Sequence, residues 1–153
     1  MAFHPYLFFG GNCREAFTRY QEIFGGDLTL ITSADMPAEE RMPDAPADSI
    51  MHAALTVDDA LLMGSDDPTN DSFGPVQGIQ VNITVRGVDE AARVFTALSE
   101  RGQVNAPLAP TSFAAAFGMC VDRFGTPWLL TTCLLYTSPS PRDISGSRMP
   151  SSA

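Results

Sequence analysis

FGMCVDRFGTPWLL, residues 117–130, predicts a β-hairpin. Its first strand should run over 117–121, and residues 128–130 should return beside it. The residues between them suit a tight turn, because aspartate and glycine are favoured at opposite ends of such turns. Pro127 fits at the start of a strand, where a missing N–H does least harm. Many folds contain a hairpin, so its meaning depends on the elements that precede it.

A helix with clear start and stop signals lies near the N-terminus. In NCREAFTRYQEIFGG, residues 12–26, Asn12 is expected to be the N-cap and Glu15 stands at the position of a capping-box partner. Two glycines end the pattern, and apolar residues recur at helical spacing at Cys13, Ala16, Phe17, Tyr20 and Phe24. These side chains should face a core.

The same order of elements occurs twice. In the first half, strands are expected at 3–9, 27–32, 50–57 and 60–65, with the helix after the first strand. In the second half, a helix within 87–102 follows a strand at 77–85 and precedes strands at 104–108, 117–121 and 128–130. The polar segments 33–48 and 66–76 should be loops.

This order predicts an α+β protein with two tandem βαβββ modules, at about 3–66 and 77–132 of a domain spanning 1–133. The halves align without gaps through strand and helix, with Leu7 matching Asn82 and Tyr20 matching Phe95. Each module should form a curved sheet with a helix on one side. The other sides of the two sheets are expected to line a shared cleft.

Composition excludes several classes of function. The chain has nine arginines and no lysine, which excludes Schiff-base chemistry and a Walker-type phosphate loop. A net charge of −9 repels nucleic acid and anionic lipid, so neither is an expected partner. No apolar run approaches the roughly 18 residues of a membrane helix, the N-terminus lacks a secretion signal, and the cysteines form no CxxC pair. We therefore expect a cytoplasmic protein.

Three stretches together resemble the vicinal oxygen chelate superfamily, and within it the PhnB-like branch. They are PYLFFGGNCREAFTRYQEIFGG (5–26), the strands IMHAALTV and LLMGSD within 50–66, and FGMCVDRFGTPW (117–128). The resemblance covers about residues 3–131. It implies the doubled βαβββ fold of glyoxalase I, extradiol dioxygenases and bleomycin-resistance proteins.

Enzymes of this superfamily hold a metal through one His, Glu or Gln from each of four strands. By the resemblance, these positions fall on Pro5, Met63, Gln80 and Leu129. Proline, methionine and leucine cannot hold a hard or borderline divalent ion. A shift of one residue would put His4 in place of Pro5, but it should also turn that side chain to the opposite sheet face. We therefore expect neither a tightly bound metal nor a cofactor.

Some PhnB-like sequences carry names that refer to a demethylubiquinone methyltransferase. In this chain FGGN, residues 9–12, lies between a strand and a helix. It lacks the G-x-G spacing and the downstream acidic residue of a dinucleotide-binding loop. A tight turn followed by a helix N-cap is expected instead.

The strand faces predict a pocket with apolar walls and a few polar groups, as is typical of small-molecule sites. His52 is the first candidate for a catalytic or orienting role, because it is the only histidine expected in the cleft. A lone histidine without a carboxylate partner is, however, more often structural. Trp128 should point toward the helix. The expected ligand-binding residues are Leu7, Phe9, His52, Met63, Ser65, Gln80, Asn82, Phe113, Phe117 and Leu129, with Thr56, Thr84 and Thr131 beside them.

Three functions fit these observations. The first is metal-independent binding of an unknown small, partly apolar molecule, as the resemblance to bleomycin-resistance proteins implies. The second is a metal-dependent lyase, isomerase or dioxygenase of the superfamily, or an enzyme that uses His52. The third is a purely structural subunit. The resemblance also implies a homodimer, whose modules pair within or across chains.

The last twenty residues, LLYTSPSPRDISGSRMPSSA (134–153), differ in character from the rest. They are rich in serine, threonine and proline and show no apolar period after Tyr136, which predicts disorder. The segment resembles a translated sequencing-library adaptor, and we interpret it as foreign to the gene. The alternative is a genuine flexible tail.

Overall fold

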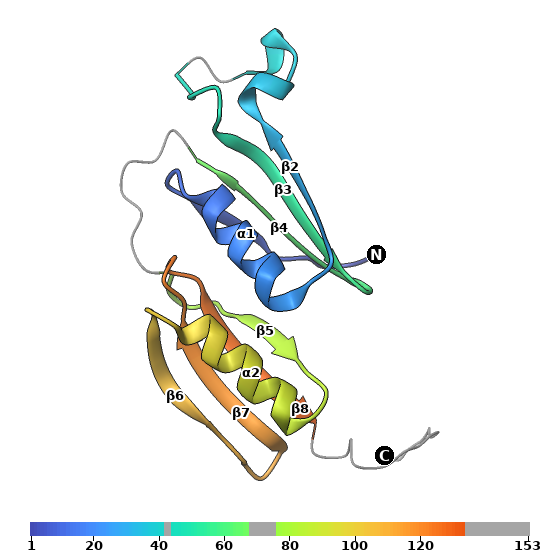
Figure 1. The fold of residues 1–153 in the computed structure, drawn as a ribbon, viewed down its shortest axis with the longest axis vertical. Helices are drawn as coiled ribbons and strands as arrows, with labels where there is room; N and C mark the ends of the chain where they lie inside the picture. The colour runs from blue at the N-terminus through green and yellow to red at the C-terminus, as the bar shows by residue number, and fades with distance from the viewer. Residues whose placement is uncertain (42–43, 68–75, 134–153) are drawn as a thin grey trace. The chain divides into compact units, whose positions relative to one another are not determined.

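The computed structural model describes residues 1–41, 44–67 and 76–133. The chain divides into two compact units. The first runs from Met1 to Val81 and includes Arg123–Thr126, and the second comprises Asn82–Asp122 and the chain from Pro127 onward. Each unit is a four-stranded sheet with one long helix over one of its faces (Figure 1). The predicted α+β architecture of two βαβββ modules is therefore confirmed.

The first unit has its strands in the order β1-β4-β3-β2. Strand β1 pairs with β4 in parallel, and the other pairs are antiparallel. The segment 33–48, predicted to be a loop, contains two short 3₁₀ turns, η1 and η2. The bounds are β1 Tyr6–Phe9, α1 Cys13–Phe24, β2 Asp27–Thr32, η1 Ser33–Asp35, η2 Ala38–Glu40, β3 Ile50–Val57 and β4 Ala60–Asp66.

The second unit repeats this arrangement with the strand order β5-β8-β7-β6. The predicted hairpin is formed by β7 and β8, which pair antiparallel from Ala114↔Cys133 to Val121↔Pro127. It is longer than predicted, because the alternation of buried and half-buried residues extends back to Ala114. The bounds are β5 Val81–Thr84, α2 Val88–Ser99, β6 Gln103–Ala109, β7 Ala114–Val121 and β8 Pro127–Cys133.

Helix α1 buries an apolar face against its sheet, centred on Phe17. The Phe17 ring packs edge-on against Phe9 at 6.1 Å and against Tyr20 at 5.5 Å between ring centroids. Gly64 on β4 makes room for it, because a Cβ there would lie 2.7 Å from Phe17 Cε1. Of the apolar positions predicted for this face, Phe24 is only half-buried, and Ile23 is buried in addition.

The second unit places a glycine in the same relation to its helix. A Cβ on Gly118 of β7 would lie 2.8 Å from Cε1 of Phe95, a buried residue of α2. Trp128 faces this side, as predicted, and is 2 % exposed. Its indole Nε1–H donates to a carboxylate oxygen of Asp122 at 2.8 Å. Asp122, predicted to be a turn residue, is thus also the buried partner of the tryptophan.

The start of α1 differs from the sequence prediction. Asn12 stands at the N-cap position but makes no side-chain capping bond. Instead Asp66, at the end of β4, accepts hydrogen bonds from the backbone N–H groups of Gly11 (3.1 Å) and Cys13 (2.9 Å). Its other oxygen accepts from Ile50 N–H at 3.0 Å. The predicted capping role of Asn12 is therefore wrong, and Asp66 belongs to the buried core rather than to a polar linker.

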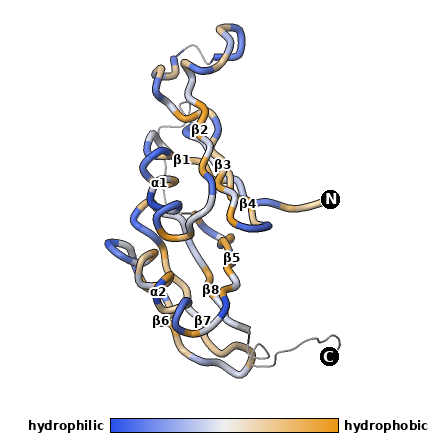
Figure 2. Tube along the Cα trace, turned by 45° about the vertical axis from the view of Figure 1, so that its right-hand side comes forward, coloured by the Kyte–Doolittle hydropathy of each residue, from blue (hydrophilic) through white to orange (hydrophobic). Residues whose placement is uncertain are grey.

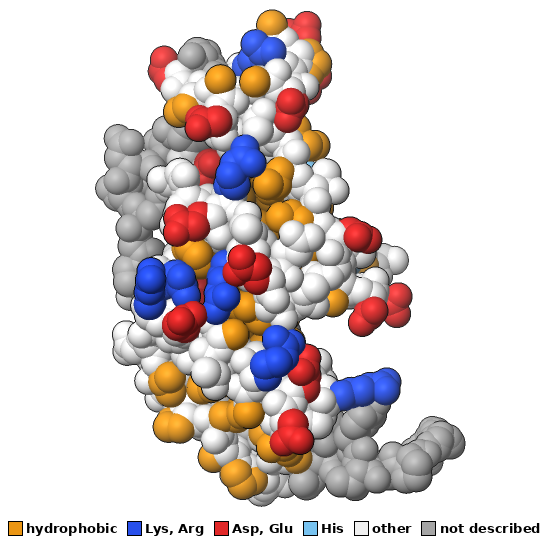
Figure 3. All heavy atoms as spheres, viewed as in Figure 1, with side chains coloured by type: hydrophobic (Ala, Val, Ile, Leu, Met, Phe, Trp, Pro, Cys, Tyr) orange, Lys and Arg blue, Asp and Glu red, His pale blue; other side chains and the backbone are white. Residues whose placement is uncertain are grey.

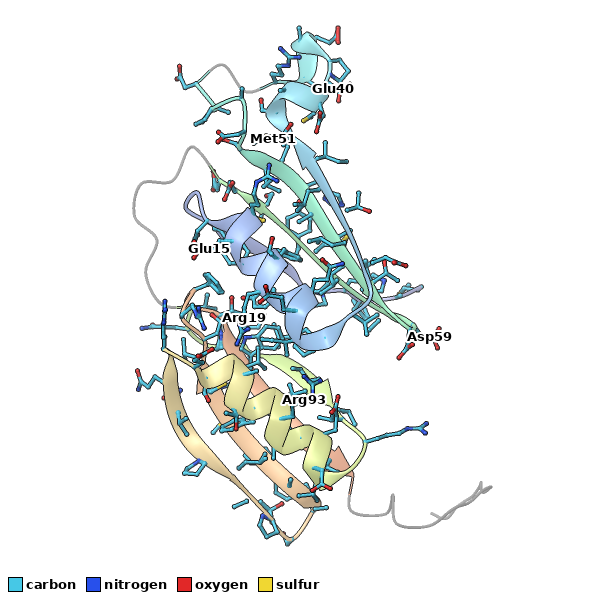
Figure 4. The ribbon with its side chains drawn as sticks, in the orientation of Figure 1. Glu15, Arg19, Glu40, Met51, Asp59 and Arg93 are labelled. Carbon is cyan, nitrogen blue, oxygen red and sulfur yellow. The ribbon has the colours of Figure 1, made fainter. Side chains whose placement is uncertain are left out.

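Two strands are shorter than predicted. The first begins at Tyr6 rather than residue 3, and β5 covers only Val81–Thr84 of the expected 77–85. In Figure 2, much of the length of the strands is coloured as hydrophobic, whereas the turn between β3 and β4 is coloured as hydrophilic. Figure 4 shows Asp59 at that turn, and Glu15 and Arg19 on α1. Among the helices that the structure describes, none is long and apolar enough to cross a membrane.

Candidate functional site

The sheet of the first unit has one face covered by α1 and one face away from it. Gly64 and its partner Ala53 lie under the helix, since a Cβ on Gly64 would meet Phe17 and Ala53 is fully buried. Side chains alternate between faces along a strand, so the neighbours of these residues point the other way. We call that face the open face of the first unit.

A polar pair embedded in aromatic rings lies on the open face. The hydroxyl group of Tyr6 on β1 lies 3.2 Å from Nδ1 of His52 on β3, within hydrogen-bond distance. The centroids of these two rings are 5.8 Å apart, and the Phe8 ring lies 5.3 Å from that of Tyr6. Tyr6 is 38 % exposed and Phe8 is 58 % exposed. The open face therefore presents accessible ring surface beside a hydrogen-bonding pair.

The remaining open-face residues surround this pair. Met63 is the Cα partner of Tyr6, and Ser65 is the partner of Phe8. Ser65 is only 6 % exposed although it points away from the helix. It lies on β4, between β1 and β3. Ile31 is paired with His52 across β2 and β3, and Thr56 lies farther along β3. Placement of His52, Thr56, Met63 and Ser65 on one face agrees with the sequence prediction; their role in ligand binding remains a prediction.

Two of the predicted pocket residues lie on the other face. Phe9 is 3 % exposed and packs against Phe17 of α1. Leu7 pairs with Gly64 and shares the orientation of Phe9. The expected placement of Leu7 and Phe9 in the cleft is therefore wrong, and Tyr6 takes the place that sequence analysis gave to them. The sequence of β1 carries no signal for this choice, because all four of its residues are aromatic or aliphatic.

The second unit also has a face away from its helix. Phe117 pairs with Thr131 and Met119 pairs with Leu129, and all four alternate with residues buried under α2. Phe113 precedes β7, is 65 % exposed and lies edge-on to Phe117 at 5.4 Å. Three further predicted residues, Gln80, Asn82 and Thr84, are exposed, with Gln80 just outside β5.

The metal positions implied by the resemblance do not fit a metal. Met63 and Leu129 lie in strands on the faces away from the helices, and Pro5 and Gln80 directly precede β1 and β5. Only Gln80 offers an oxygen donor, so the set lacks the chemistry of a divalent site. Across residues 1–41, 44–67 and 76–133, no three His, Cys, Asp or Glu side chains are close enough to hold an ion.

His4 and Pro5 lie directly before β1. Tyr6 and Phe8 are the open-face residues of β1, so alternation gives residue 4 the parity of Tyr6 and residue 5 that of Leu7. Residues 4 and 5 thus have opposite parity, as expected, but the parity of the open face is that of residue 4 rather than residue 5. Both His4 and Pro5 precede the strand, and His4 is exposed.

The two buried thiols are poor nucleophiles. Burial, with a smaller contribution from the negative charge of Asp66, raises the pKa of Cys13 to about 12. Burial likewise raises the pKa of Cys120 to about 11, with the Asp122 carboxylate adding to it. Since the thiolate is the reactive form, neither side chain is a candidate for covalent catalysis.

Comparison with known proteins agrees with this architecture. The family model described as 3-demethylubiquinone-9 3-methyltransferase matches residues 1–131. The chain belongs to this PhnB-like family. Protein YjdN of Escherichia coli (strain K12) is 30 % identical to this PhnB-like chain over 139 residues, covering 85 % of the chain and 94 % of YjdN.

Solved structures share the fold of the PhnB-like chain. Protein PA1353 from Pseudomonas aeruginosa is 41 % identical, with a TM-score of 0.78 over 86 % of this chain and 97 % of that one. PhnB protein from Bacillus cereus is 23 % identical, with a TM-score of 0.69 over 87 % and 100 % of the two chains. A glyoxalase/bleomycin resistance protein/dioxygenase family enzyme from Burkholderia phytofirmans PsJN, 12 % identical, shares the fold at a TM-score of 0.58 over 86 % and 97 %.

The loop FGGN of this PhnB-like chain is a structural turn. The N–H groups of Gly11 and Cys13, which in a nucleotide-binding loop would face a phosphate, donate to the Asp66 carboxylate. A negative charge already occupies that position. The segment bends at Gly10 and Gly11 and leads into α1, but the expected N-cap is not formed, because Asn12 makes no side-chain capping bond.

Proposed function

We propose that this PhnB-like protein binds a small, partly apolar molecule without a metal, on the open face of the first unit. The observation that carries the proposal is the Tyr6–His52 hydrogen bond within accessible aromatic surface. Aromatic rings supply contact area, and a convergent polar pair supplies orientation, which is the usual make-up of a small-molecule site. The unsuitable donor set at the four superfamily metal positions supports the metal-independent form of the proposal.

Thermal unfolding of chelator-treated protein with a library of small aromatic metabolites tests this function. At least one compound should raise the melting temperature, and Phe8→Ser should abolish the shift by removing exposed ring surface. Val104→Ser is the matched control, because Val104 is an exposed hydrophobic residue on β6 of the second unit. That variant should keep the full shift.

Elemental analysis separates this proposal from a metal-dependent lyase, isomerase or dioxygenase. One transition metal per purified chain, together with loss of ligand binding on chelation, would overturn the metal-independent proposal. Absence of stabilisation by every compound, with and without added divalent ions, would instead favour a structural subunit.

A further inference from the structure

From the same open face we infer the chemical class of the ligand: a neutral, planar ring that carries a hydroxyl group, as in a phenol. This inference rests on the proposed function, because it specifies what the Tyr6–His52 pair would recognise. It follows from three features of the pair: how the two side chains meet, which hydrogen-bonding groups they leave, and which charges surround them.

The two side chains meet across an intervening strand. Tyr6 lies on β1 and His52 on β3, while β4 runs between these strands. The two rings are inclined at only 35°, and Tyr6 is inclined at 45° to Phe8. The three rings therefore lie close together on the open face, two on β1 and one on β3, on either side of β4. A flat molecule can stack on such a surface, whereas a bulky saturated one would contact only part of it.

The pair leaves one donor and one acceptor for a ligand, whichever tautomer His52 adopts. If the Tyr6 hydroxyl donates to Nδ1, then Nε2–H remains as donor and the phenol oxygen as acceptor. If Nδ1–H donates to the phenol oxygen, then the Tyr6 O–H remains as donor and Nε2 as acceptor. A ligand hydroxyl both donates and accepts, so it complements either arrangement. An ether or a carboxylate can use only the donor.

The surrounding charges disfavour an anion. Strands β1 to β4 contain no arginine, and their only acidic residues are Asp27 and Asp66. Asp66 is engaged by backbone N–H groups, and Asp27 pairs with Thr56, about 13 Å along the sheet from His52 at the usual rise per residue. The arginines of this unit lie on α1 and in loops, and Figure 3 shows charged side chains gathered over α1. With no arginine or lysine in strands β1 to β4, a neutral ligand is favoured.

Naphthol and three analogues provide the test, with dissociation constants measured by fluorescence titration or calorimetry. Naphthol should bind about three- to tenfold more tightly than methoxynaphthalene, the range expected for one added hydrogen bond. Naphthoate should bind more weakly than both because it is an anion. The saturated analogue of naphthol should bind most weakly, because it cannot stack.

Two variants assign the preference to the pair. Tyr6→Phe keeps the ring and removes the hydroxyl, so methoxynaphthalene binding should persist while the naphthol preference falls. His52→Gln should reduce the preference as well. Val104→Ser, in the other unit, should change neither constant.

The outcomes distinguish failure of this inference from failure of the proposed function. If naphthoate binds most tightly, or Tyr6→Phe leaves the naphthol preference intact, the inferred ligand class is wrong. If no naphthalene binds while a library compound still depends on Phe8, the ligand class is wrong and the proposed site stands. If Phe8→Ser leaves all binding unchanged, the proposed site itself is wrong.

Discussion

Asp66 satisfies three backbone N–H groups with one carboxylate, and this single residue joins the loop before α1 to the ends of β3 and β4. Local spacing in the sequence favours Asn12 as the cap, because Asn12 lies directly before the helix. A cap supplied from 53 positions away in the chain has no local signature. The position of the helix start was thus predictable, whereas the group that stabilises it was not.

Replacing Asp66 by Asn should destabilise the protein markedly. The amide keeps one acceptor oxygen but turns an NH₂ group toward a backbone donor, so at least one buried N–H loses its partner. We expect a loss of about 2 to 3 kcal/mol in the free energy of unfolding, measured by urea denaturation. Asp35→Asn is the control: this carboxylate caps η1 but is exposed, so its loss should be much smaller.

The control variant also has a definite pH signature. The backbone N–H of Thr32, with the Thr32 side chain second, lowers the pKa of Asp35 below its ordinary value. Its contribution to stability is therefore present above the unfolded-state pKa and is lost as the pH falls through the folded-state value. The difference between wild type and Asp35→Asn should shrink in acid; a difference independent of pH would contradict the capping role.

Cys13 and Cys120 are both buried free thiols. In a Cys133→Ser background, Cys13 and Cys120 should react with a disulfide reagent at pH 8 only as fast as the protein unfolds, since both are buried and have pKa values raised to about 12 and about 11. In the unfolded chain the thiols ionise at lower pH. The contribution of these two thiols to the free energy of unfolding is therefore fully present below about pH 9. It is lost as the pH rises toward their pKa values in the folded protein. Rapid labelling of the native protein would show that a thiol is accessible.

Among the elements, strand β1 is the one whose buried and open faces the sequence pattern does not distinguish. In PYLFFGG every strand position is aromatic or aliphatic, so the alternation that assigns a strand's faces is missing. The prediction that Leu7 and Phe9 face the cleft is wrong. In the structure Tyr6 and Phe8 lie on the open face, and Leu7 and Phe9 face the helix. Strand β7 alternates clearly between buried and half-buried residues. The face of the β7–β8 hairpin, including Trp128, was accordingly predicted correctly.

Packing of α1 on its sheet predicts the effect of Gly64→Ala. The new Cβ would lie 2.7 Å from both Phe17 Cε1 and the backbone oxygen of Leu7. The ring can move but the strand backbone cannot without disturbing the β1–β4 pairing, so we expect a loss of about 1 to 3 kcal/mol. Thermal or urea unfolding measures it. Gly64→Ala combined with Phe17→Leu forms a double-mutant cycle, and strictly additive losses would contradict a clash with the ring.

For the whole molecule, the duplicated order of elements was the strongest signal in the sequence. Hydrophobic periodicity, glycine stops and turn residues are local features, and they occur twice in the same order, so the two modules could be predicted without a structure. The Tyr6–His52 contact joins strands that are 46 positions apart through a side-chain conformation. No local pattern encodes such a contact, which is why His52 was predicted as a candidate and its partner was missed.

The described fold ends close to residue 133. Residues 134–153 lie outside the described residues, so their predicted disorder and foreign origin remain predictions from composition. The family match ends at residue 131, and strand β8 ends at Cys133. Ending the chain at residue 133 should therefore remove no buried apolar surface, and the melting temperature should stay within about 2 °C of the full-length value, since a shift of that size is under 1 kcal/mol for a domain of this length. Calorimetry of both forms measures this difference. A lower melting temperature in the shortened chain would show that the segment packs against the fold, and would favour a native tail over a foreign one.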